Sequence, residues 1–204
     1  MANVVVINSG LSNIDSICRA LELCGAHVQV ISSVRGLGKS DRLVLPGVGA
    51  FPPAMKRLEK LGFAEYILKH ISEERPFLGI CLGMQLMAEF SLELKKCTGL
   101  GILPAYVRPL TKTSSEERIP HMGWSPVDHD QTHPLFSGIP TGTDFYFVHG
   151  YHMVCLNDPH ILARTNAYGS FAAAVGRGVI FGVQFHPEKS QRPGLALLRN
   201  FLSM

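Results

Sequence analysis

A thiol stands between two glycines at the point where an apolar segment gives way to a helical one. The segment Gly79-Ile80-Cys81-Leu82-Gly83 ends the short apolar run 77–80, which is typical of a buried strand. The residues that follow, 84–89, have a composition that favours a helix. Flanking glycines allow a sharp strand-to-helix turn, the geometry of a nucleophile elbow, where helix N–H groups and the helix dipole stabilise a thiolate. Taken alone, the pattern fits a buried structural cysteine equally well.

The first half of the chain alternates between segments typical of strands and of helices. Short apolar runs that predict strands occupy 4–7, 27–31, 42–45 and 77–80. Helical patterns cover 14–24, 52–60 and 63–74. This alternation indicates βαβ units and a parallel sheet.

The pattern changes after residue 99. Shorter strand-like segments lie at 102–107, 145–148, 172–175 and 179–185, and a closing helix is expected at 193–202. Such segments favour antiparallel pairing, so the predicted fold is α/β with a mixed, mostly parallel central sheet. With 204 residues, of which 46% are hydrophobic, the chain is expected to form a single domain spanning 1–204.

Composition argues against several classes of protein. Charged residues make up 17% of the chain, the net charge is +3, and no basic run interleaved with aromatics predicts a nucleic-acid groove. No apolar run approaches the ~20 residues that cross a membrane. The apolar start at 1–7 lacks a positive region and is expected to be a strand rather than a signal peptide.

Cysteine and histidine spacing predicts neither a metal site nor a cofactor. The five cysteines are an odd number without a C-x-x-C pair, which favours reduced thiols and a cytoplasmic setting. His129 and His133 are four residues apart, but they lie in a polar stretch, 128–134, that is typical of a loop. No phosphate loop or dinucleotide fingerprint is present.

A base for the thiol is predicted near the C-terminus. Pro187 disfavours a helical conformation at His186, and in an extended chain residues two apart point to the same side. Glu188 is therefore expected to hold one imidazole nitrogen of His186 while the other faces the thiol. An incidental histidine at a strand end is the simpler interpretation of this segment alone, and the elbow at Cys81 argues against it.

Two glycines after the third predicted strand favour an oxyanion hole. In Gly47-Val48-Gly49 the backbone can approach a ligand closely and point N–H groups at it. The hole would combine the N–H of Leu82 with one from Val48 or Gly49. A tight turn between a strand and a helix explains the same glycines, and the two interpretations are compatible.

These motifs together resemble a known family. The segments 46–51, 79–85 and 184–190 are similar to those of class I (triad) glutamine amidotransferases. Pro120-His121-Met122-Gly123-Trp124 and Tyr146-Phe147-Val148-His149 narrow the resemblance to the glutaminase subunits of imidazole glycerol phosphate synthase. The resemblance covers the chain from Val4 to Phe201 and implies a three-layer, flavodoxin-like fold.

The resemblance implies a mechanism and a substrate. Cys81 would attack the side-chain amide of L-glutamine, His186 would protonate the departing ammonia and then activate water, and Glu188 would orient His186. Three further positions match residues that hold the substrate glutamine in the family: Gly47, Gln85 and Glu93. For Gln85 a helix-surface amide, and for Glu93 a solvated helix end, are the structural alternatives. The resemblance implies no cofactor.

The resemblance also implies a heterodimer. Its partner would be a (β/α)8-barrel cyclase subunit that receives the ammonia through a channel and makes imidazole glycerol phosphate and an aminoimidazole carboxamide ribonucleotide. Asn13, Tyr146 and Lys189 match family positions at that interface, although an exposed lysine is common on any surface. The alternatives are a glutaminase subunit of a different synthase and a non-catalytic amidotransferase-like binding subunit.

The chain departs from the family pattern at several positions. These are the segment Asn8-Ser9-Gly10, Ser12 in place of glycine, Ser125 in place of asparagine, and Gly150 in place of serine or threonine. They lie in the expected interface loop and near the expected glutamine site, and none of them is Cys81, His186 or Glu188.

Overall fold

A nine-stranded sheet forms the centre of the molecule, and five of its strands are parallel. The computed structural model describes residues 2–10, 12, 14–35 and 40–204. The parallel strands are neighbours in the order β2 (Ala26–Ile31), β1 (Ala2–Ile7), β3 (Arg42–Gly47), β4 (Phe77–Cys81) and β13 (Ile180–Val183). The sheet continues antiparallel through β12 (Phe171–Arg177), β11 (Ile161–Thr165), β8 (His121–His129) and β9 (Thr143–His149). The predicted mixed, mostly parallel sheet is confirmed.

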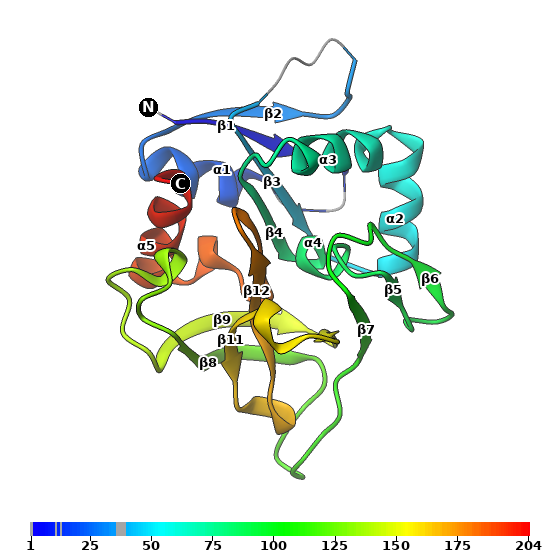
Figure 1. Cartoon of the computed structure of the whole chain (residues 1–204). Helices are drawn as coiled ribbons and strands as arrows, with labels where there is room; N and C mark the ends of the chain where they lie inside the picture. The colour runs from blue at the N-terminus through cyan, green and yellow to red at the C-terminus, as the bar shows by residue number, and fades with distance from the viewer. Residues whose placement is uncertain (1, 11, 13, 36–39) are drawn as a thin grey trace.

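Helices cover both faces of the parallel half, which gives three layers (Figure 1). One face carries α1 (Ile14–Leu23) and α5 (Gln191–Leu202), and the other carries α2 (Phe51–Lys60), α3 (Phe63–Ser72) and α4 (Leu82–Gln85). Along β1, Val4 and Val6 pack with α1, whereas Val5 and Ile7 pack with α2 and α3. This two-residue alternation, apolar on both faces, is the pattern of a strand buried from both sides.

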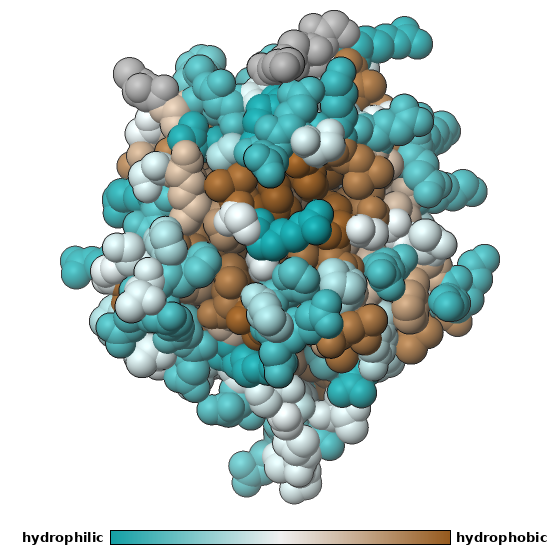
Figure 2. Space-filling view, viewed as in Figure 1, coloured by the Kyte–Doolittle hydropathy of each residue, from teal (hydrophilic) through white to brown (hydrophobic). Residues whose placement is uncertain are grey.

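A smaller four-stranded sheet lies beside the helical layer that contains α4. Its order is β10 (Tyr151–Cys155), β7 (Ala105–Pro109), β5 (Phe90–Ser91) and β6 (Cys97–Thr98). The remaining described elements are short 3-10 turns at Pro134–Phe136, Asp158–His160, Ala167–Gly169 and Pro187–Lys189. On the face drawn in Figure 2, hydrophobic residues gather near the middle and hydrophilic residues surround them.

The helix expected at 84–89 is wrong in length. Helix α4 is a single turn that ends at Gln85, and β5 begins at Phe90. The carbonyls of 86–88 accept hydrogen bonds from the backbone of 100–103, which comes from another part of the chain, instead of from a second helical turn. Tertiary pairing here overrides the helical composition.

Five of the described strands were not expected from the sequence: β5, β6, β8, β10 and β11. Strand β8 contains Gly123 and Pro126 and includes His129, although the polar composition of 128–134 predicts a loop. Proline is tolerated because β8 pairs with β9 over His121–Val127 and reaches β11 only at Asp128 and His129. The segment predicted as a strand at 102–107 forms β7 from Ala105 onward.

Candidate active site

Cys81 occupies the strained turn that its flanking glycines predicted. It ends β4 and caps α4 with φ 54° and ψ −109°, a backbone conformation that is costly for a residue other than glycine. A Cβ at Gly83 would lie 1.8 Å from the carbonyl oxygen of Leu45, and one at Gly79 would lie 2.6 Å from the carbonyl oxygen of Gly83. Both glycines are therefore required for α4 to pack directly on the sheet. Because α4 has only one turn, its dipole is weaker than that of the longer helix predicted.

The sulfur of Cys81 is nearly buried and has two polar neighbours. The side chain is 5% exposed, its Sγ lies 3.8 Å from the carbonyl oxygen of Val148, and Nε2 of Gln184 donates to it at 3.6 Å. The thiol is thus held among hydrogen-bonding groups at the rim of a cavity rather than packed away among apolar side chains.

His186 and Glu188 form a buried pair beside this thiol. Nδ1 of His186 lies 2.8 Å from Oε1 of Glu188, with the side chains 3% and 8% exposed. Burial lowers the pKa of His186, but its interactions with Cys81 and Glu188 outweigh that effect and raise the pKa to about 10. Among the described residues no group completes a hydrogen bond to Nε2, and the interaction of the ring with Cys81 is the largest of the effects that raise the pKa of His186.

The contact between His186 and Glu188 forms by a different route from the one expected. His186 is extended, with φ −100° and ψ 97°, as Pro187 predicted. The next residues form a 3-10 turn, Pro187–Lys189, instead of continuing the strand. This turn brings the carboxylate of Glu188 back over the imidazole, which strand alternation alone would not do.

Ser190 fixes this turn to the sheet. Its Oγ donates to the carbonyl oxygen of His186 at 2.6 Å and accepts from the N–H of Tyr146 at 3.0 Å. The N–H of His186 also donates to the carbonyl oxygen of Tyr146 at 2.8 Å. The position of His186 therefore depends on β9 as well as on β13.

A cavity of about 190 Å³ opens beside the thiol. Its lining residues come from three parts of the chain and are Val48, Gly49, Cys81, Leu82, Gln85, Val148, His149, Gly150 and Tyr151. All three residues predicted to supply oxyanion N–H groups are in this lining. Gly47 ends β3 directly opposite Cys81 in the register, and it lines a smaller cavity of about 60 Å³ together with His186 and Glu188.

The other predicted glutamine contacts are placed differently. Gln85 lines the cavity, and its Nε2 donates to the carbonyl oxygen of Tyr151 at 2.8 Å. Glu93 is not in the described lining; it is 8% exposed, and its Oε2 accepts from the N–H of Phe51 at 2.7 Å, at the start of α2. Neither structural alternative applies, because both side chains are buried.

The predicted interface residues lie close to the triad. Lys189 is exposed, and its Nζ lies 5.8 Å from the centre of the Tyr146 ring, which in turn packs edge-on against Trp124. Trp124 and Met122 on β8 are 46% and 65% exposed. Asn13 lies outside the described residues.

Three residues near the thiol were not singled out as site residues from the sequence: Gln184, His149 and Ser190. Each of the three lies within one of the sequence motifs that predicted the site. Gln184 is entirely buried, but no local pattern in the sequence distinguishes such a polar residue from its neighbours. Among the described residues no group of three or more histidine, cysteine, aspartate or glutamate side chains could hold a metal ion. In the same part of the chain, no helix is long and apolar enough to cross a membrane.

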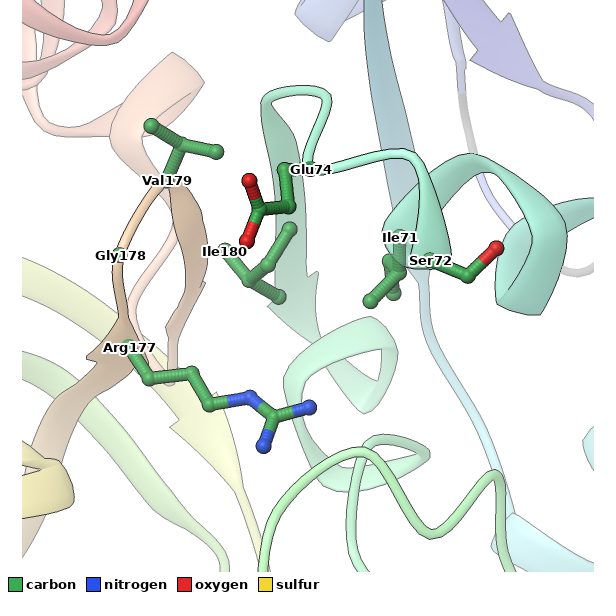
Figure 3. Close-up of a pocket in the computed structure, with 7 residues that line it drawn as sticks. All are labelled: Ile71, Ser72, Glu74, Arg177, Gly178, Val179 and Ile180. Atoms are coloured by element: carbon green, nitrogen blue, oxygen red, sulfur yellow. The ribbon is translucent and has the colours of Figure 1, made fainter.

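Another cavity, of about 650 Å³, lies at the opposite end of the parallel strands, and Figure 3 shows the residues that line it. It is bounded by the end of α3 and by the turn between β12 and β13, and its polar side chains are Ser72, Glu74 and Arg177. It has no thiol or imidazole in its lining. Ligands of open α/β sheets bind at the carboxyl ends of the strands, so the cavity of about 190 Å³ beside Cys81 is the better candidate for the substrate site.

Comparison with solved structures supports the fold. A glutamine amidotransferase crystal structure aligns with a TM-score of 0.75 at 18% identity, covering 98% of this chain and 99% of that chain. The structure of PurLQS from Thermotoga maritima aligns with a TM-score of 0.75 at 20% identity, covering 99% and 98%. At these identities the likeness concerns the fold, and the expectation of an amidotransferase-like α/β fold is confirmed.

Comparison of sequences identifies the family. The model of glutamine amidotransferase class-I matches residues 5–204. Imidazole glycerol phosphate synthase subunit HisH of Synechococcus sp. (strain JA-2-3B'a(2-13)) is 45% identical over 202 residues, covering 98% of this chain and 91% of that protein. The subunit of the same name from Syntrophotalea carbinolica is 41% identical over 206 residues, covering 98% and 100%. The resemblance seen in the sequence is confirmed, and the chain belongs to the class I glutamine amidotransferases and, within them, to the HisH family of imidazole glycerol phosphate synthase subunits.

Proposed function

We propose that this chain hydrolyses L-glutamine with Cys81 as nucleophile, His186 as acid and base, and Glu188 as the group that orients His186. One observation carries the proposal. The strained thiol at the end of β4 lies beside a buried imidazole–carboxylate pair and at the rim of a small cavity. A nucleophile, a base and an orienting group in this order are the parts that covalent catalysis of amide hydrolysis needs.

The raised pKa of His186 suits the first step. At neutral pH the ring is protonated, because interactions with Cys81 and Glu188 raise its pKa to about 10 despite burial. A protonated ring beside the sulfur favours the thiolate, which is the nucleophilic form. Glu188 accepts the hydrogen bond from Nδ1, and this leaves the Nε2 proton available for transfer.

The reaction then proceeds in two stages. The thiolate adds to the carbonyl carbon of the glutamine side chain, and backbone N–H groups of Leu82 and of Val48 or Gly49 stabilise the resulting oxyanion. The imidazolium gives its proton to the amide nitrogen, the C–N bond breaks, and ammonia leaves behind a γ-glutamyl thioester. Neutral His186 next takes a proton from water, whose oxygen adds to the thioester carbonyl, and the C–S bond breaks to release glutamate and the thiolate.

Three residues are proposed to hold the glutamine. Gln85 lies in the cavity wall, and Gly47 ends the strand that leads into the oxyanion loop. Glu93 is the third proposed contact for the substrate, although one of its carboxylate oxygens already accepts a hydrogen bond from the N–H of Phe51. For Glu93 to reach the substrate, its carboxylate would have to use the other oxygen or move.

The ammonia is proposed to pass to a cyclase subunit of imidazole glycerol phosphate synthase. Membership of the HisH family supports this partner over that of a different synthase. The proposed partner surface includes Lys189, which is exposed and lies over the ring of Tyr146, and Trp124, which is exposed and packs against the same ring. Tyr146 itself accepts a hydrogen bond from the N–H of His186. All five cysteines are free thiols, which supports a reducing, cytoplasmic compartment.

The test is glutamate release from glutamine by the purified chain, alone and with a cyclase subunit plus its nucleotide substrate. We expect slow hydrolysis alone, strong stimulation by the loaded cyclase, and a loss of at least about 10³-fold in Cys81→Ala. Cys155→Ala is the matched control, because burial raises the pKa of that thiol to about 11 and keeps it unreactive. Activity that persists in Cys81→Ala would contradict the nucleophile, and activity that ignores the cyclase would contradict the partner.

A further inference from the structure

Gln184 is a buried amide in direct contact with the proposed nucleophile, and it has no role in the hydrolysis mechanism proposed for this chain. Its side chain is 0% exposed and lies where the chain leaves β13 for His186. Nε2 donates to Sγ of Cys81 at 3.6 Å, and Oε1 accepts from Nε2 of Gln85 at 3.0 Å. A fully buried amide must satisfy both ends with suitable partners, so the direction in which it points has consequences for the sulfur.

The direction of this amide is determined by a backbone carbonyl. Nε2 of Gln85 lies 2.8 Å from the carbonyl oxygen of Tyr151, which can only accept a hydrogen bond. Gln85 must therefore present its NH2 group there, and the same NH2 group contacts Gln184. Because a donor faces it, Gln184 must present its oxygen to Gln85 and consequently its own NH2 group to the sulfur of Cys81. Reversing the amide would set two NH2 groups against each other and turn an acceptor toward the thiolate.

The carbonyl of Tyr151 is itself held by a chain of neutral imidazoles. Nδ1 of His149 donates to it at 2.8 Å, and burial lowers the pKa of His149 to about 3. Because Nδ1 carries the proton, Nε2 of His149 accepts from Nδ1 of His121 at 3.2 Å. Nε2 of His121 then accepts from the hydroxyl of Ser125 at 2.9 Å. In this series of hydrogen bonds each donor or acceptor determines the next. The carbonyl oxygen of Tyr151 therefore accepts from two donors, Nδ1 of His149 and Nε2 of Gln85, and its position is fixed by both.

We propose that Gln184 is a catalytic residue that donates a hydrogen bond to the sulfur of Cys81, and that Gln85 is the positioning residue that turns the Gln184 amide toward the sulfur. This inference rests on the proposed function, since it concerns the same nucleophile. A donor aimed at the sulfur stabilises the thiolate over the thiol, because hydrogen bonds to a charged acceptor are stronger than those to a neutral one. It also holds Sγ at the cavity rim, where attack on the substrate begins.

The inference is tested by the pH dependence of Cys81 alkylation with iodoacetamide, followed by mass spectrometry of the peptide that contains Cys81. This readout uses no glutamine, so it is separate from substrate binding. In Gln184→Met, which keeps the length of the side chain but removes both polar groups, the midpoint of alkylation should rise by about one pH unit. Gln85→Met should raise it by less, because the Gln184 amide remains but is no longer held in one orientation. The matched control is Gln131→Met, an exposed position outside the site.

Each outcome decides the inference. A raised midpoint in Gln184→Met, together with a fall in kcat of about tenfold and little change in KM, supports a donor to the sulfur. A midpoint equal to that of the wild type shows that Gln184 only packs against Cys81, and this overturns the inference. If Gln184→Met does not fold, the test is made with Gln85→Met: a raised alkylation midpoint supports the inference, and a midpoint equal to that of the wild type overturns it. The proposed function fails separately, through glutaminase activity that survives Cys81→Ala, and the alkylation midpoint does not depend on that result.

Discussion

Replacing Ser190 with alanine should loosen the triad without touching any triad side chain. The hydroxyl of Ser190 is fully buried and connects β9 to the segment that follows β13: it donates to the carbonyl oxygen of His186 and accepts from the N–H of Tyr146. Alanine fills nearly the same volume, so the change removes two hydrogen bonds and creates almost no cavity.

The two lost bonds differ in cost. The carbonyl oxygen of His186 keeps a second donor, the N–H of Lys189 at 3.0 Å, so it is not left unsatisfied. The N–H of Tyr146 points at Ser190 and loses its acceptor in a half-buried position. An unsatisfied buried donor costs about 1–3 kcal/mol, and partial exposure favours the lower part of that range, about 1–2 kcal/mol. For a domain of this size the melting temperature should then fall by about 2–8 °C.

Activity should fall more than stability alone explains. His186 would lose one of the two connections that hold its backbone to β9, and small displacements of a catalytic group are expensive in rate. We expect kcat for glutamine hydrolysis to fall about tenfold in Ser190→Ala, with KM nearly unchanged, because the cavity wall is untouched.

Ser203→Ala is the matched control for this experiment. Its hydroxyl donates to the carbonyl oxygen of Asn200 at 2.7 Å, but the bond is exposed at the end of α5, and water can replace it. The melting temperature of this variant should stay close to that of the wild type. Thermal unfolding and steady-state glutaminase assays of both variants check the reasoning. Equal melting temperatures for Ser190→Ala and Ser203→Ala would refute the cost assigned to the Tyr146 N–H.

Three further changes probe the elbow, the triad and the partner surface. Gly83→Ala should destabilise the chain by about 1–3 kcal/mol or more and abolish glutaminase activity, because its Cβ would lie 1.8 Å from the carbonyl oxygen of Leu45; an unchanged melting temperature would contradict this. The pKa of His186 is raised from 6.5 to about 10 in the folded state, so the stabilisation it gives is full below pH 6.5 and is lost as the pH rises through 10. The melting temperatures of wild type and Glu188→Gln should therefore converge over that interval, and a constant difference would argue against the pairing. Lys189→Ala should reduce stimulation of glutaminase activity by the cyclase while the melting temperature stays unchanged, because the side chain is exposed; parallel loss of both would count against an interface role.

Most of the parallel half could be predicted from the sequence because each of its elements has a local cause. Strands such as β1 and β3 are apolar on both faces, since helices cover both sides of them. The elbow was predictable for a similar reason: only glycine fits at 79 and 83, and the residue midway between them carries a thiol. In each of these cases the residues that determine the local structure lie within a few positions of it in the sequence.

The antiparallel half and the finer parts of the site depend on contacts between distant segments. Strand β8 contains glycine and proline, and its pairing with β9 decides its conformation. Helix α4 stops after one turn because the backbone of 100–103 takes the next carbonyls. The match to the family predicts a substrate contact for Glu93, whereas its hydrogen bond with the N–H of Phe51, 42 residues away, has no local signature in the sequence.

The sheet order explains how three motifs far apart in the sequence form one site. The proposed oxyanion loop follows β3, the thiol ends β4, and His186 follows β13, and these are adjacent parallel strands with β4 in the middle. Because parallel neighbours end at the same edge of a sheet, the three motifs meet there without any long loop to bring them together. Strand β13 comes from the last quarter of the chain and pairs with β4 from Phe77 to Ile80. Whatever separates β13 from β4 would thus part the thiol from its proposed base while leaving every motif intact, so the pairing of these two strands is as necessary to the proposed chemistry as the triad residues themselves.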